Sequence, residues 1–173
     1  MQSFTNGMEE RFKFSLYVRN FIFGVEDSLV STVGLLSGIA TSQVPHATIL
    51  LTGFIYVFVE AFSMAVGSFL SEDSAQEYIA KSEVSDRLPV AGSVIMFVSF
   101  LAAGFIPIFP YLIWSGVSAL YASVSFSLAT LFVLGFINGK LSRIKPWRRA
   151  IRMAILGGLA IGIGVIVGEF FKI

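Results

Sequence analysis

Five long apolar stretches, separated by short polar segments, account for most of the chain. They run over about residues 21–41, 48–70, 90–109, 112–137 and 150–171, and each is close to the ~20 residues that an α-helix needs to cross a bilayer. This pattern predicts an all-α integral membrane protein, in which residues 21–173 form one domain of five transmembrane helices. Residues 1–20 mix charged with aromatic side chains, which predicts an N-terminal interfacial segment that leads into the first span.

The segments between the spans carry the turn signals. Residues 71–88 form the longest polar segment, and an apolar helical stripe within it predicts that the second span continues into the water as a helix that Pro89 ends. Pro107 and Pro110 predict that the third span closes in a tight, uncharged turn. The single histidine, His46, falls in the short connection before the second span, where we expect it to be solvated.

The distribution of basic residues predicts the orientation in the membrane. Of the twelve lysines and arginines, three precede the first span, two follow the second and six follow the fourth, so only Lys172 falls on the opposite side. Because cytoplasmic segments are enriched in Lys and Arg, the N-terminus is expected in the cytoplasm and the C-terminus outside it. We therefore expect a multi-pass protein, in the plasma membrane of a prokaryote or the vacuolar membrane of a eukaryote.

Composition narrows the class of protein. Only 13% of the residues are charged, against about 25% in soluble domains, which leaves no room for a separate soluble domain. The absence of cysteine excludes disulfides and thiolate metal sites. The chain offers no Ser/His/Asp set, no HExxH and no GxGD-type aspartate pair, which argues against a membrane hydrolase. We expect a protein that is not an enzyme, with the bilayer as its surroundings, no bound cofactor and no nucleic-acid partner.

Carboxylates within the first span are the main functional signal. Glu26 and Asp27 are adjacent at membrane depth, where a charged side chain is costly and marks a functional site by default. The two cannot easily ionise together in a low dielectric, so one is either protonated or turned toward the headgroups. Helical spacing places Ser31, Gly34 and Gly38 on the Asp27 face, which allows another helix to approach closely.

The second span supplies a matching set. Glu60 lies near its middle, and Met64 and Ser68 follow on the same face, one turn apart. Carboxylate oxygens suit hard ions such as Mn²⁺, and a thioether adds preference for softer ones, with Fe²⁺ between them. Asp27, Glu60, Met64 and Glu26 are therefore the predicted metal ligands, and the weaker candidates for cytoplasmic entry are Glu72, Asp73 and Glu77.

Structural explanations compete with these assignments. Met64 could serve packing alone, and Glu60 could hydrogen-bond to a serine and hold helices together. Glu169 is expected to pair with Lys172 near the outer surface. The glycine-rich fifth span, with its pairs Gly158–Gly162 and Gly164–Gly168, is typical of close helix packing.

Several stretches, taken in order, resemble the vacuolar iron transporter family. The first span is similar to that family's aspartate-bearing helix, the second to its Ser-Met signature, and the third to the span that ends in paired prolines. The resemblance extends through the fourth and fifth spans, and it rests on YVRNFIFGVEDSLVSTVGLLSGIA, AFSMAVGSFLS, FLAAGFIPIFPYL, LGFINGKLS and PWRRAIRMAILGGLAIGIGVIVG.

The resemblance implies a five-helix protomer that forms a two-fold dimer, with the first two helices lining a pathway for Fe²⁺, or Mn²⁺, to leave the cytoplasm in exchange for protons. The faces bearing Gly34 and Met64 are expected to meet across the two-fold axis. The family's pathway aspartate and methionine match Asp27 and Met64.

Three features depart from the family pattern. Ser28 replaces a glycine, and Ser68 replaces a glutamate for which Glu60 could substitute. Residues 71–88 stand in place of a long cytoplasmic metal-binding domain, so the chain resembles a short form of the family. The alternative function is a non-transporting membrane scaffold or assembly partner, in which the buried acids specify helix pairing.

Overall fold

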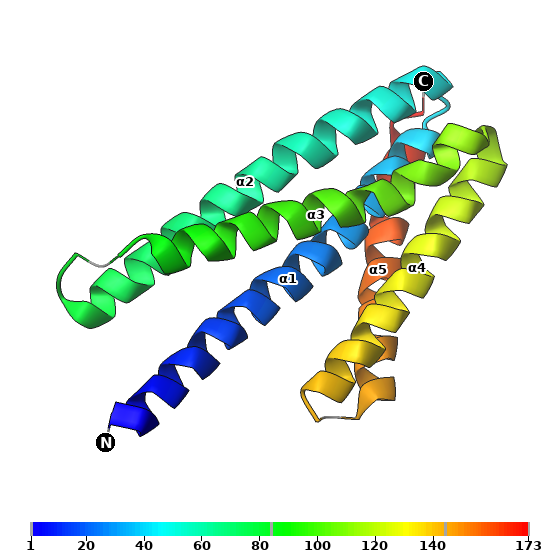
Figure 1. Ribbon diagram of the computed structural model, residues 1–173. Coiled ribbons are helices and arrows are strands. Elements are labelled where there is room, and N and C mark those ends of the chain that lie inside the picture. Colours follow the sequence, from blue (N-terminus) through cyan, green and yellow to red (C-terminus); the bar gives the residue numbers. More distant parts are fainter. Residues whose placement is uncertain (1, 84, 144, 173) are drawn as a thin grey trace.

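The structure, a computed structural model, describes residues 2–83, 85–143 and 145–172, with side chains from Glu10 onward. Within these ranges it contains five helices and no strand, and all five helices are long and apolar enough to cross a membrane. The predicted all-α, five-span architecture is confirmed. The helices are α1 (Gln2–Thr41), α2 (His46–Ala80), α3 (Arg87–Ile113), α4 (Gly116–Leu141) and α5 (Pro146–Phe170) (Figure 1).

Helix α1 is the central element of the bundle. It contacts every other helix, while α2 packs mainly on α3 and α4 mainly on α5 (Figure 1). The α2–α3 and α4–α5 connections lie toward the same end of the molecule as the N-terminus, and the C-terminus lies at the opposite end. This arrangement gathers the basic segments at one end, as the charge distribution predicts. That this end faces the cytoplasm stays a prediction.

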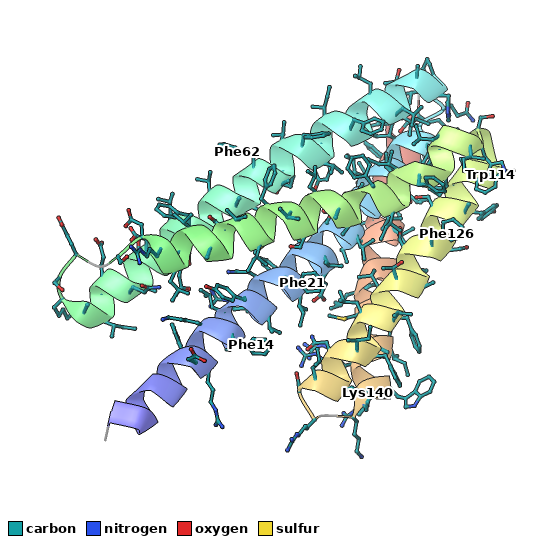
Figure 2. All side chains as sticks on the ribbon, viewed as in Figure 1. Phe14, Phe21, Phe62, Trp114, Phe126 and Lys140 are labelled. Carbon is teal, nitrogen blue, oxygen red and sulfur yellow. The ribbon has the colours of Figure 1, made fainter. Side chains whose placement is uncertain are left out.

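Large apolar side chains cover the outer surface of the bundle, as expected for a protein surrounded by lipid. Figure 2 shows Phe14, Phe21 and Phe62 projecting outward from α1 and α2, and all three are at least half exposed. The buried interior combines apolar side chains, such as Phe100 and Leu29, with small polar ones, such as Ser28 and Thr32. Residues 2–20 are helical and lead into the first span without interruption, and their place at the membrane interface stays a prediction.

The α2–α3 connection differs from the prediction. Helix α2 ends at Ala80, where Lys81 adopts a left-handed conformation (φ 56°) and its N–H donates to the Glu77 carbonyl. Pro89 does not end this helix. It lies in the first turn of α3, where a missing N–H costs no intrahelical hydrogen bond.

The turn predicted at Pro107 and Pro110 is also displaced. Both prolines lie inside α3, which continues to Ile113, and both are buried. Proline is tolerated within transmembrane helices where neighbouring groups satisfy the backbone. Ser123 on α4 donates to the Pro107 carbonyl at 2.7 Å, which ties α4 to this part of α3, and the Trp114 N–H donates to the Pro110 carbonyl at 2.9 Å, where α3 ends.

Helices α1 and α5 approach each other through glycines. A Cβ on Gly164 or Gly168 would overlap the carbonyl of Gly34 or Gly38, respectively, so only glycine permits this contact. The Gly164–Gly168 pair thus packs helices as predicted, whereas a Cβ on Gly158 or Gly162 would meet no atom within 4 Å. Gly34 and Gly38 therefore pack against α5 of the same protomer, and that they also face a two-fold axis stays a prediction.

Helices α1 and α3 are joined through Ser28. Its side chain is fully buried, and its hydroxyl donates to the Phe100 carbonyl at 2.6 Å. The adjacent Gly24 allows Ser99 of α3 to come close. Because successive residues are about 100° apart around a helix, fixing Ser28 against α3 turns Asp27 to a different side of α1.

Candidate functional site

Asp27 and Glu60, the two acids predicted to form the site, come together from different helices. Both are half-buried, and they are close enough for their charges to interact. Tyr56, one turn before Glu60, interacts with both acids and with Ser31. Ser31 in turn donates to the backbone carbonyl of Asp27 at 2.6 Å. The structure therefore adds Tyr56, which sequence reasoning missed because it reads as one more aromatic residue in an apolar span.

A row of polar side chains at four-residue spacing extends this pair along α2. Ser68 lies against Asn20 of α1, with its hydroxyl 3.3 Å from the Asn20 amide oxygen. One turn further, Glu72 pairs with Arg19 of α1. We call this set the α1–α2 polar seam; it comprises Arg19, Asn20, Asp27 and Ser31 of α1, with Tyr56, Glu60, Met64, Ser68 and Glu72 of α2.

Glu72 is already engaged within the protein. Its side chain is 7% exposed, Arg19 Nη2 donates to Oε2 at 3.0 Å, and Gln76 Nε2 donates to Oε1 at 3.0 Å. Of the other entry candidates, Asp73 is half-buried and Glu77 is exposed. Both oxygens of Glu72 are occupied, so a metal ion would have to compete with Arg19 to bind there.

Glu26 faces a different neighbourhood from Glu60. Its charge interacts with Arg149 and Arg152 at the start of α5, as well as with Asp27. This position favours a role as counter-ion to the arginines over a role as metal ligand. The sequence contained no local signal for this, because the partners are more than a hundred residues apart.

A groove of about 500 Å³ starts beside the acid pair and runs toward the end of α1. Ser31 and Tyr56 line it next to the acids, and Ser42, Gly168 and Phe171 line its far end. Its walls are mostly apolar and come from α1, α5 and Tyr56 of α2. The groove continues the direction of the polar seam toward the end of the molecule opposite the N-terminus.

The described part of the chain holds no cluster of three or more His, Cys, Asp or Glu that could bind a metal. One protomer offers the carboxylates of Asp27 and Glu60, with the Tyr56 hydroxyl and, one turn along α2, the Met64 thioether. A complete coordination sphere for a divalent ion needs further ligands from water or from a second protomer.

Glu169 and His46 lie outside the polar seam, and the structure shows the neighbours of each. Glu169 accepts from Lys172 Nζ at 3.0 Å, as predicted. The expectation that His46 is solvated is wrong. It is half-buried, its ring centroid lies 6.4 Å from that of Tyr111, and its buried Nδ1 has no hydrogen-bond partner among the described residues.

Comparison with known proteins decides the family. A model of the VIT family matches residues 18–88 and 81–169, nearly the whole described chain. The chain belongs to the VIT family. Vacuolar iron transporter 1 of Tulipa gesneriana is 23% identical over 212 residues, covering 88% of this chain and 86% of the relative. Vacuolar iron transporter homolog 4 of Arabidopsis thaliana is 28% identical over 165 residues, covering 85% and 80%, respectively.

Family membership makes this VIT protein a membrane transport protein rather than an enzyme, and with five spanning helices it is a multi-pass protein. The 212-residue alignment with the tulip protein is longer than the 173 residues of this chain, so the relative carries additional residues. The two matched segments of the family model overlap at 81–88, in the α2–α3 connection, where this chain has only a short segment.

Proposed function

We propose that this VIT protein moves a divalent metal ion, Fe²⁺ or Mn²⁺, out of the cytoplasm in exchange for protons. The observation that carries the proposal is that Asp27 of α1 and Glu60 of α2 are both half-buried in spanning helices and near enough for their charges to interact. Buried acids on facing helices mark ion pathways in membrane proteins. The names of the curated relatives, vacuolar iron transporters, support iron as the substrate.

The polar seam supports a route to this pair. Its residues lead from the basic end of the bundle, at Arg19 and Glu72, past Ser68 and Met64 to Asp27 and Glu60. The seam offers carboxylate and hydroxyl oxygens and one thioether, without cysteine, and such ligands bind a metal weakly enough to release it again. The groove beyond Ser31 then offers a path to the opposite end of α1.

A two-fold dimer would complete both the site and the groove. Among the described residues each protomer has fewer than three clustered ligands, and a symmetric partner would double the carboxylates available to one ion. The groove is lined mainly by apolar side chains. We therefore place the two-fold axis along the groove, where Ser31, Gly34 and Gly38 of α1 form one wall, with the partner's α1 covering it.

Proton coupling follows from the same acids. A carboxylate in a transmembrane helix can take part in a proton relay as well as in an ion pathway. A divalent cation would displace a proton bound there, and protons arriving from the opposite side would release the cation. One site that alternates between metal and protons gives antiport.

The decisive experiment is metal uptake into proteoliposomes under an imposed pH gradient, with Fe²⁺ and Mn²⁺ compared. We expect uptake that the gradient drives, and we expect Met64→Leu to weaken Fe²⁺ transport more than Mn²⁺ transport, because it removes the thioether but keeps the volume. Glu169→Gln, outside the seam, is the matched control and should behave like wild type. Wild-type uptake no greater than that of empty vesicles would favour the scaffold function.

A further inference from the structure

The hairpin between α4 and α5 concentrates positive charge. Its tip and the first two turns of α5 carry half of the twelve lysines and arginines in the chain, and all six of these side chains are exposed. Figure 2 shows Lys140 at this end of α4. The six residues are Lys140, Arg143, Lys145, Arg148, Arg149 and Arg152.

The two helices of the hairpin pack closely, so the backbone that carries these charges is held in place. A Cβ on Gly139 would lie 2.6 Å from Pro146 Cα, and one on Gly135 would lie 2.7 Å from Ala150 Cα. With its amide oriented to satisfy all its neighbours, the buried Asn138 accepts from Arg149 Nε and Nη2 at 3.2 Å each. Arg149 therefore projects from a rigid base.

Arg148, Arg149 and Arg152 lie on adjacent turns of α5, at the i, i+3 and i+4 spacings that bring side chains together. None of the three arginines forms a salt bridge within 4 Å with a described carboxylate. The half-buried carboxylate of Glu26 interacts with the charges of Arg149 and Arg152 at longer range. We call the three arginines the α5 basic face. It carries three guanidinium groups against one carboxylate, which leaves unbalanced positive charge.

Trp147 indicates the depth of this face in the membrane. Its indole is 63% exposed and lies edge-on to Phe132 and Phe136 of α4, with ring centroids 5.7 and 5.5 Å away. Tryptophan is enriched where headgroups meet hydrocarbon. The uninterrupted apolar part of α5 begins at Met153, directly after Arg152, so the arginines lie at the headgroup level.

We propose that the α5 basic face binds the phosphate of an anionic phospholipid. Clusters of four to eight Lys or Arg beside a transmembrane helix recognise anionic headgroups, and arginine binds phosphate through two parallel hydrogen bonds. The rigid hairpin and the lack of close carboxylate partners favour a defined lipid site over a solvated charged surface. This inference is independent of the transported metal.

The two tryptophans allow a direct test, because Trp114 lies in the α3–α4 turn at the other end of the molecule. In a Trp114→Phe background, Trp147 fluorescence reports lipid at the basic face, and in a Trp147→Phe background Trp114 is the control. Each protein is reconstituted with mixtures of phosphatidylcholine and phosphatidylglycerol in which one lipid carries brominated, quenching chains. We expect phosphatidylglycerol to quench Trp147 beyond its mole fraction, and Trp114 in proportion to it.

Neutralising the basic face should remove this preference, by roughly fivefold in relative affinity for each arginine that contacts the phosphate. The variant R148Q/R149Q/R152Q removes the whole face, and R148Q/R152Q keeps Arg149 on Asn138 in case the triple variant fails to fold. R11Q/K81Q/R87Q makes the same change in net charge at other exposed positions and should keep the preference. Three outcomes would overturn the proposal: the control loses the preference for phosphatidylglycerol equally, R148Q/R152Q keeps it in full, or Trp147 shows no preference with all arginines present. Any of them would leave an acidic protein as the partner to examine.

Discussion

Arg19 Nη2 donates to Glu72 Oε2 at 3.0 Å and joins α1 to α2 across 53 residues of sequence. The pair is unequal, since the Glu72 side chain is 7% exposed and that of Arg19 is 63% exposed. The energetic consequence of losing a partner should therefore depend on which partner is lost.

Arg19→Gln should destabilise the protein more than Glu72→Gln. Removing the guanidinium leaves a buried carboxylate with Gln76 alone, at a cost of about 1–3 kcal/mol. Removing the carboxylate leaves an arginine that water already reaches. Thermal unfolding in detergent checks this, and the double variant R19Q/E72Q should recover most of the loss. A larger loss for Glu72→Gln would contradict the buried-carboxylate explanation.

Asp27→Asn should reduce metal uptake to the level of empty vesicles without lowering thermal stability. The amide keeps the shape of the side chain but cannot neutralise a cation, and a buried acid is lost. Glu60→Gln should behave in the same way if it supplies the second carboxylate. Uptake and unfolding are measured on the same preparation. Normal transport by Asp27→Asn, or failure through misfolding alone, would refute the assignment, whereas a silent Glu60→Gln would restrict Glu60 to helix packing.

Gly164→Ala should weaken the bundle, and Gly162→Ala should not. A methyl group at Gly164 meets the Gly34 backbone, which cannot give way as a flexible side chain can, whereas one at Gly162 enters open space. Overpacking of this kind costs about 1–3 kcal/mol. The two variants differ by one methyl group on the same helix, so a comparison of their melting temperatures isolates the α1–α5 contact. Equal melting temperatures would show that the two helices can move apart freely.

The proposed dimer predicts a disulfide between protomers in Ser31→Cys. Ser31 lines the groove that the partner's α1 would cover, and the chain contains no other cysteine. Ser125→Cys, exposed on α4 away from the groove, is the control. Oxidation in native membranes followed by non-reducing electrophoresis should give a dimer band for Ser31→Cys only. A monomer in both cases would remove the shared groove from the proposal.

The predicted orientation is tested by single cysteines at exposed positions. With the protein in the plasma membrane of intact cells, Ser82→Cys and Ser142→Cys should resist an impermeant thiol reagent, because they are predicted to be cytoplasmic, while Ser115→Cys in the α3–α4 turn lies on the opposite side. In whole cells with the protein in the plasma membrane, only Ser115→Cys should be labelled. The reverse pattern would invert the protein and the direction of transport.

The sequence alone determined the class of structure and the positions of its polar groups. Hydrophobic length predicts the five spans because a bilayer needs about 20 apolar residues per helix. Helical spacing also grouped Glu60 with Met64 and Ser68, since positions four apart share a face in any helix. These properties are local, so they can be predicted without knowing which helices are neighbours.

Which faces meet was decided only by the tertiary structure. The glycines on the Asp27 side of α1 could accept any close helix, and the fold assigns them to α5. The partners of Glu72 and Glu26 lie far away in sequence, and so does Ser123 of α4, which donates to the Pro107 carbonyl of α3. A periodic pattern describes each helix by itself, whereas pairing depends on contacts that exist only after the helices have packed together.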